Sequence, residues 1–276
     1  MTQPTSRRGF LTSSVGLTAG AALASQLHSV AYAAPGEPEW IDLFNGETLD
    51  GWHKNPDKIG HGTGGHWQVE EGSITGEQDP PGSGNGGVLL TDETFGDFEL
   101  LIDIKPDWGV CSGLFLRGND QGQCFQMMVD YHDAGNIGHL YGEGTTGFNT
   151  RTFDINGELN DEGQLVGMTT VLTKTADEVG LYHTCAPDEW VTAWKVGDWN
   201  RIRVRMEGKY PIITTWINGL RVNKFDGGSA ATGNYDREAI FKMIGVAGSI
   251  GVQVHGGGGW PVGAKCRWKN VKIRNL

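Results

Sequence analysis

Polar and apolar residues alternate with a period of two along several short segments of the chain. Residues 98–105 (FELLIDIK) and 198–207 (DWNRIRVRME) show this pattern most clearly, and it returns in residues 249–255 and 266–276. Successive side chains of a strand point to opposite faces, so the pattern predicts half-buried β-strands. Residues 67–74 indicate two strands joined by a turn, and Asn218-Gly219 is a strong two-residue hairpin turn.

Many short strands with little predicted helix favour an all-β fold, either an antiparallel β-sandwich or a jelly roll. Residues 149–191 have the least regular pattern. We expect this segment to be a long irregular excursion that packs over one face or rim of a sheet. A short helix is predicted near residues 188–194, with Asp188 close to its start.

Two neighbouring strands predicted within residues 109–141 carry the first candidate binding residues. Gln126 and Asp130 are four residues apart and separated only by apolar residues. Because alternate residues of a strand point to the same side, the two share one face. Arg117 of the preceding strand could meet them if the register allows. An arginine, an amide and a carboxylate on one pleated face could form a floor that binds polyols. The alternative is the ordinary solvated face of a half-exposed sheet.

Composition agrees with a turn-rich β-protein and narrows the range of partners. The 276 residues include 44 glycines and 10 tryptophans, which suits short strands, many turns and aromatic platforms. The net charge of −11 argues against a polyanionic partner such as nucleic acid.

The first 33 residues have the features of a twin-arginine export signal. Arg7-Arg8 precede an apolar stretch over residues 17–24, and Ala31-Tyr32-Ala33 provides a small-x-small cleavage site. We therefore expect residues 34–276 to form one mature domain that is periplasmic or extracellular. No second long apolar run predicts a membrane span.

Four cysteines raise the question of disulfides. In an exported protein they could be oxidised, and a bridge between Cys111 and Cys124, which flank the two strands above, is one pairing among three. Buried free thiols are the alternative. The spacing of Cys111, Cys124, Cys185 and Cys266 is not that of a metal site.

Several motifs, taken together and in order, resemble the 3-keto-disaccharide hydrolase domain family. They are WIDLFNGETLDGW, WQVEEGSI, FELLIDIK, CSGLFLRG, WNRIRVR, INGLRV, GSIGVQVHGG and WKNVKIRNL, and the resemblance covers residues 38–276. It implies a concanavalin A-like β-sandwich, which agrees with the strand pattern.

The resemblance also implies cleavage of glycosides that are already oxidised to a ketone at C3. A base can remove the C2 proton, the enolate can expel the C1 substituent, and water can add back, which gives net hydrolysis. A non-catalytic carbohydrate-binding module or lectin remains an alternative. A classical glycosidase of the same fold would need paired carboxylates on one strand, and no such run is evident.

The resemblance suggests His255 as the base, Arg117 as the group that stabilises the enolate, and Gln253 as a contact to a sugar hydroxyl. The strand over residues 124–130 departs from the family pattern Y-E-x-Q-x-x-D. The base could therefore be Asp130 or Glu143 instead.

Further candidates for sugar contacts are Gln126, Tyr141 and Trp260. Tryptophans 52, 194 and 260 could stack on sugar rings, although core packing is their more common role. A divalent ion held by His255, Asp130 and Glu143 is an open possibility. Three histidines in the Gly-rich segment, His53, His61 and His66, could form a second metal site or lie on a mobile surface loop.

Overall fold

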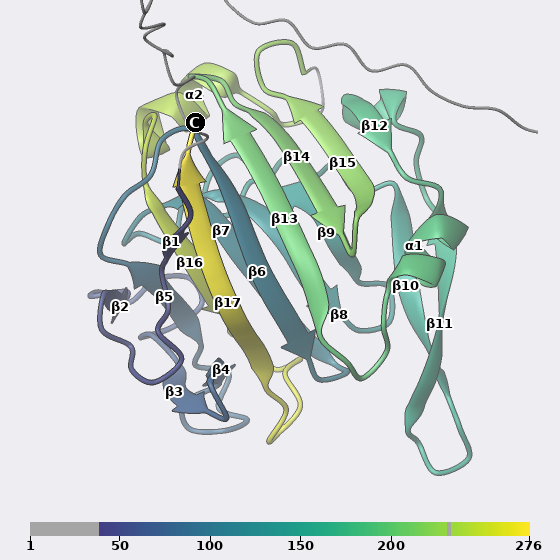
Figure 1. Cartoon of the computed structure of the whole chain (residues 1–276). Helices are drawn as coiled ribbons and strands as arrows, with labels where there is room; N and C mark the ends of the chain where they lie inside the picture. The colour runs from purple at the N-terminus through teal and green to yellow at the C-terminus, as the bar shows by residue number, and fades with distance from the viewer. Residues whose placement is uncertain (1–38, 231–232) are drawn as a thin grey trace, which may run out of the picture. The chain divides into compact units, whose positions relative to one another are not determined.

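The computed structural model describes residues 39–230 and 233–276, and the predicted export signal over residues 1–33 lies outside them. These residues form two antiparallel β-sheets that face each other (Figure 1). The predicted β-sandwich is therefore confirmed. Among the described residues, no helix has both the length and the apolar character needed to cross a membrane.

The larger sheet has nine strands, and every pairing in it is antiparallel. In spatial order they are β12 (Leu181–Thr184), β15 (Leu220–Asp226), β14 (Ile212–Ile217), β13 (Asn200–Glu207), β6 (Phe98–Pro106), β17 (Cys266–Asn275), β4 (Ser73–Glu77) and β3 (His66–Glu70), with β1 (Ile41–Asp42) paired to β17.

The smaller sheet has six strands and carries the candidate site. Their order is β2 (Trp52–Lys54), β5 (Gly87–Thr91), β16 (Ser249–Val254), β7 (Val110–Gly118), β8 (Phe125–Tyr131) and β9 (Asn136–Tyr141).

The alternating pattern decides which residues fill the space between the sheets. Ile102 of β6 and Val204 of β13 belong to the main core cluster, as do Met127 and Val129 of β8. Their strand neighbours point away from the core, so each sheet has an outer face made of the intervening residues. The Asn218-Gly219 turn joins β14 to β15 as predicted, with the positive φ angles of 51° and 91° that a type I′ turn needs.

The excursion over residues 149–191 contains more regular structure than expected. Strands β10 (Phe153–Leu159) and β11 (Leu165–Leu172) form a separate two-stranded sheet, followed by a 3-10 turn, η1 (Asp177–Val179), and by β12. This ribbon was missed because only one of the eight β11 residues is buried, so no clean alternation marks it. The helix predicted near residue 188 is confirmed as α1 (Pro187–Ala193), and α2 (Arg237–Ile244) was not predicted.

All four cysteines are free thiols in the structure. Cys111 lies directly across from Asp130 on β8, and its thiol hydrogen-bonds to that carboxylate. Cys124 is buried against Val88, Leu90 and Phe115 on the other side of the strand turn. The predicted Cys111–Cys124 bridge is therefore not formed.

Candidate functional site

A small cavity of about 260 Å³ opens on the outer face of the six-stranded sheet. It lies toward the β9 edge of this sheet, away from the main core. Its lining comes from β7, β8, β9, the loop after β9 and the end of β16, and consists of Cys111, Gln126, Met128, Asp130, Tyr141, Glu143, Asn149, Arg151 and His255. Five of the residues proposed from the sequence thus meet at one place.

Strand β8 forms the floor of the cavity because alternate residues share one face. Gln126 and Asp130 line the cavity together with Met128. The register sets Tyr141 of β9 opposite Gln126. Gly113 of β7 makes room for the Gln126 side chain, since an added Cβ would lie only 2.2 Å from its Nε2 atom. This contact gives a physical reason for the glycine in the SGLFLR motif.

Asp130 is the acid with the most strongly perturbed titration in the cavity. Burial raises its pKa to about 6, although the Cys111 thiol, which donates a hydrogen bond to Oδ1 over 3.1 Å, and the nearby His132 and Arg151 lower it. The carboxyl group can therefore exchange a proton near neutral pH, which acid–base catalysis requires.

His255 follows β16 and presents one free ring nitrogen. Its Nδ1 donates to the carbonyl oxygen of Gly256 over 2.5 Å, which fixes the tautomer and leaves Nε2 unprotonated in the neutral ring. Nε2 has no hydrogen-bond partner among the described residues. Burial and the neighbouring His61 lower the pKa of His255, so the neutral form dominates at pH 7.

A buried chain of polar groups supports the floor of the cavity. Gln126 Nε2 donates to Gln253 Oε1 over 2.8 Å. His61 Nε2 lies 3.0 Å from Gln253 Nε2 and 3.1 Å from Glu143 Oε1. A single ring nitrogen can either accept from Gln253 or donate to Glu143, so it serves one of them at a time. The His61 ring also packs edge-on against His255, with centroids 4.5 Å apart.

The sequence did not predict Arg151, and it predicted His61 only as a ligand of a separate metal site or as part of a mobile loop. His61 lies in a Gly-rich segment that was considered a mobile loop, yet its side chain is only 11% exposed. Arg151 lines the cavity and is held by the Ala134 carbonyl oxygen at 2.9 Å and by Asp154 at 3.1 Å. Neither residue belongs to a periodic pattern, so only the fold reveals them.

Arg117 lies outside the cavity, contrary to expectation. It is six residues along β7 from Cys111, the residue opposite Asp130, which is on the order of 20 Å at the usual rise of a strand. Its buried guanidinium instead donates to the Gly96 carbonyl oxygen and to Asp97, at 3.1 and 3.0 Å. The register of the two strands thus excludes the predicted meeting with Asp130.

The predicted tryptophan platform is also absent from the cavity. Trp260 is 5% exposed, and its indole donates to the Ala264 carbonyl oxygen. Trp52 and Trp194 are buried as well, with indole hydrogen bonds to the Leu43 carbonyl oxygen and the Tyr131 hydroxyl. All three fulfil the alternative role of core packing.

Gln253 is fully buried beneath the cavity. It therefore reaches the site through Gln126 and His61 rather than by lining the cavity itself. Gln253 could therefore affect a bound sugar only through Gln126 or His61, and not by the direct hydroxyl contact that was predicted.

The donor groups do not favour the predicted metal set. Among the described residues, Cys111, Asp130 and His132 form the one group whose ligand atoms all approach within 4.8 Å of one another, and it omits His255 and Glu143. Burial raises the pKa of the Cys111 thiol far above its ordinary value. A protonated thiol that donates a hydrogen bond to Asp130 is a poor metal ligand, so we derive no step through a metal.

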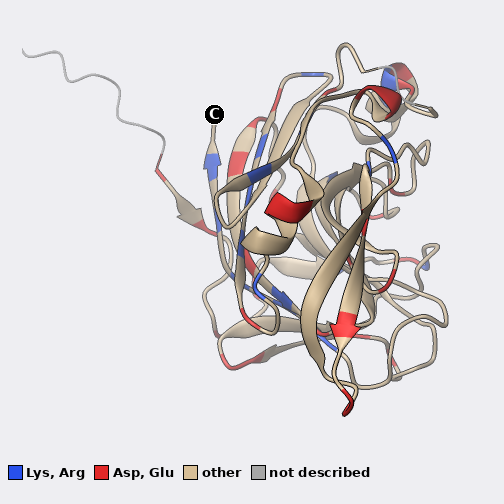
Figure 2. Ribbon diagram, turned by 90° about the vertical axis from the view of Figure 1, so that its right-hand side faces the viewer, with Lys and Arg blue, Asp and Glu red and all other residues tan. Residues whose placement is uncertain are grey.

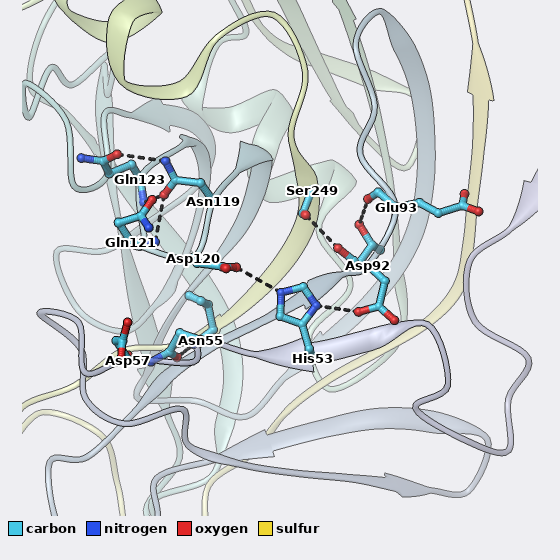
Figure 3. Close-up of polar contacts among 12 residues, drawn as sticks. His53, Asn55, Asp57, Asp92, Glu93, Asn119, Asp120, Gln121, Gln123 and Ser249 are labelled. Carbon is cyan, nitrogen blue, oxygen red and sulfur yellow. Dashed lines mark hydrogen bonds and ion pairs between the residues drawn. The ribbon is translucent and has the colours of Figure 1, made fainter.

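The three histidines of the Gly-rich segment do not form a second site. Figure 3 shows His53 between two carboxylates, with Nδ1 2.6 Å from Asp92 and Nε2 3.1 Å from Asp120. His61 belongs to the cavity described above, and His66 is exposed on β3, where its ring contacts Gln68. The segment runs from β2 of the six-stranded sheet to β3 of the nine-stranded sheet, and its three histidines have different surroundings.

Comparison with known proteins identifies the family of the chain. The family model of the 3-keto-alpha-glucoside-1,2-lyase-like domain matches residues 39–274. The chain belongs to this family. Membership places it among carbohydrate-acting domains, as the sequence motifs suggested. No curated protein matches the chain significantly.

Solved structures that resemble the chain do so at low sequence identity. A candidate glycosyl hydrolase from Parabacteroides distasonis ATCC 8503 has a TM-score of 0.50 at 17% identity, over 86% of this chain and 100% of that one. A Bacillus licheniformis β-glucanase (TM-score 0.42, 12% identity, 88% and 100% covered) and a Bacillus subtilis carbohydrate-binding module (0.39, 12%, 82% and 96%) are also similar. At these identities the likeness concerns the fold alone.

Proposed function

We propose that this protein cleaves 3-keto-glycosides by elimination across C1 and C2, followed by hydration. The observation that carries the proposal is a cavity in which a neutral histidine with a free Nε2, a carboxyl group with a pKa of about 6 and an arginine lie around one space. The family match over residues 39–274 supports a keto-sugar as the substrate.

The proposed reaction begins with proton transfer from C2 to Nε2 of His255. The ketone at C3 makes this proton acidic, because the electron pair left on C2 forms an enolate whose negative charge is on the C3 oxygen. The enolate then re-forms the ketone and expels the C1 oxygen, which leaves a C1–C2 double bond. Water adds to C1 and a proton returns to C2, so the sum of the steps is hydrolysis of the glycosidic bond.

Asp130 is assigned as the acid that protonates the leaving C1 oxygen. The raised pKa keeps part of this carboxyl group protonated near neutral pH, whereas an ordinary aspartate would be fully ionised. Arg151 takes the role proposed from the sequence for Arg117, because a guanidinium at the cavity wall can stabilise the enolate oxygen.

The test compares a chromogenic 3-keto-glucoside with its unoxidised parent, each with and without a chelator. We expect release of the chromophore from the keto form alone, and a chelator effect would reveal a metal requirement. Release from both substrates would indicate an ordinary glycosidase. Binding of the sugar without release would indicate a carbohydrate-binding module.

Substitution of the base separates turnover from binding. His255→Gln should lower kcat at least 100-fold and change KM little, because general-base catalysis typically contributes a factor of about 10² to 10⁴. His66→Gln is the matched control, since His66 is exposed on β3 of the other sheet. Export through the twin-arginine pathway stays a prediction, which fractionation of the expressing cells would test.

A further inference from the structure

A second hollow, here called the outer groove, lies on the outer face of the nine-stranded sheet. It has a volume of about 750 Å³ and is lined by Glu70, Glu71, Ser73, Lys105, Asp107, Trp199, Arg267 and Lys269. The cavity of the proposed reaction is on the outer face of the opposite sheet, so the whole core separates the two sites.

The lining of the outer groove contains three basic residues, Lys105, Arg267 and Lys269, beside three acidic ones. Figure 2 shows lysine and arginine segments along the strands next to the C-terminus, which belong to the nine-stranded sheet. Most of these cations have an acidic partner. Arg267 binds Asp107 at 2.7 Å and Lys265 binds Glu70 at 2.7 Å, so these charges stabilise the sheet itself.

Lys105 and Lys269 are the exceptions. Within the described part of the chain, neither ammonium group has a hydrogen bond or an ion pair, although Asp103 lies directly opposite Lys269 and interacts with its charge. The register sets Lys105 of β6 directly opposite Arg267 of β17, and like charges in directly opposed positions destabilise a sheet. Arg267 is already paired with Asp107, whereas Lys105 has no ion pair among the described residues, and an anion bound between Lys105 and Lys269 would balance its charge.

The remaining lining residues favour a sugar as the carrier of that anion. Trp199 provides an aromatic ring, with Lys269 Nζ 4.0 Å from its centre, and such rings pack against the apolar faces of sugars. The exposed Glu71, at the turn between β3 and β4, has no hydrogen-bond partner among the described residues. Its carboxylate can accept hydrogen bonds from sugar hydroxyl groups.

We propose that the outer groove binds an acidic saccharide, a glycan whose uronate carboxylate lies between Lys105 and Lys269. The carboxylate draws Lys269 away from the Trp199 ring, and the uncovered indole then contacts the sugar. An exposed cation–π contact is weak, so a charged ligand can displace it. The site would hold the enzyme on a polyuronate while the opposite sheet acts on its own substrate. The inference does not depend on the reaction proposed above.

The experiment measures binding of trigalacturonate to the full protein by calorimetry at low and at moderate salt. We expect binding that weakens with salt, and at least a tenfold weaker affinity for Lys105→Gln and for Lys269→Gln. The carboxyl-reduced form of the same trisaccharide should not bind. Lys105→Arg should keep the affinity, and Lys272→Gln is the matched control because Lys272 already pairs with Asp42.

Three results would overturn the proposal. The first is unchanged affinity in both lysine variants, with thermal melting showing that they are folded. The second is equal binding of the carboxyl-reduced trisaccharide, or displacement of trigalacturonate by inorganic sulfate at equal concentration. The third is loss of trigalacturonate binding in His255→Gln, which would place the ligand in the other cavity. Activity on the 3-keto-glucoside should be the same in Lys105→Gln as in the unaltered protein.

Discussion

Replacing Asp130 with asparagine should make the protein more stable at neutral pH and less active. Burial raises the pKa of this carboxyl group from 3.8 to about 6, so the ionised form is unfavourable in the folded state. Each tenfold change in proton affinity corresponds to about 1.4 kcal/mol, which gives about 3 kcal/mol for the full difference. Since the side chain is partly accessible through the cavity, we expect about 2 to 3 kcal/mol.

The sign of this effect fixes its pH window. The raised pKa means that the folded state binds the proton more tightly than the unfolded chain does. Ionisation of Asp130 therefore destabilises the unaltered protein progressively as the pH rises from about 4 to above 6. Asp130→Asn lacks this loss, so its advantage in the free energy of unfolding should be small at pH 4 and reach its full size at pH 7.5.

Urea unfolding at four or five pH values from 4 to 8 measures this difference directly. Asp161→Asn, in the exposed turn between β10 and β11, is the control and should follow the unaltered protein at every pH. In parallel, Asp130→Asn should lose a factor of about 10² to 10⁴ in kcat. If the two stability curves stay parallel across this range, Asp130 is an ordinary carboxylate and its role as the acid is wrong.

Three further predictions follow from other groups. The pH profile of kcat/KM should fall above about pH 6, where Asp130 loses its proton, and fall again well below pH 6.5, where His255 gains one; a rate that instead rises through pH 6 would make Asp130 the base. Arg117→Ala should lower the free energy of unfolding by about 3 kcal/mol or more, because it leaves a cavity and unpaired partners. The variant should keep kcat/KM per folded molecule. A selective loss of kcat would instead support the catalytic role predicted from the sequence. Burial lowers the pKa of His53, but hydrogen bonds to Asp120 and Asp92 outweigh this effect and raise the pKa. His53→Gln should therefore lower the free energy of unfolding by up to about 1 kcal/mol below pH 6.5, and by progressively less as the pH rises through the raised pKa. An equal loss at pH 5.5 and pH 9 in urea unfolding would contradict the ion pairing.

The strand pattern predicted the fold because each alternating segment needs only local information. Ile202, Val204 and Met206 are buried and the arginines between them point outward, as a period of two requires. The same logic placed Gln126 and Asp130 on one face of β8, and both line the cavity. Where almost no position is buried, as in β11, the pattern carries no signal, and the ribbon was not recognised.

The sequence by itself determined the sandwich, the outward-facing residues of β8, the short helix α1 and the family. The tertiary structure decided which of the candidates meet. Register placed Cys111 rather than Arg117 opposite Asp130, and loop packing brought His61 and Arg151 to the cavity from segments with no periodic pattern. The physical reason is that side-chain direction along a strand is a local property, whereas register, loop packing and burial, and therefore the pKa of Asp130, arise only when distant segments pack together.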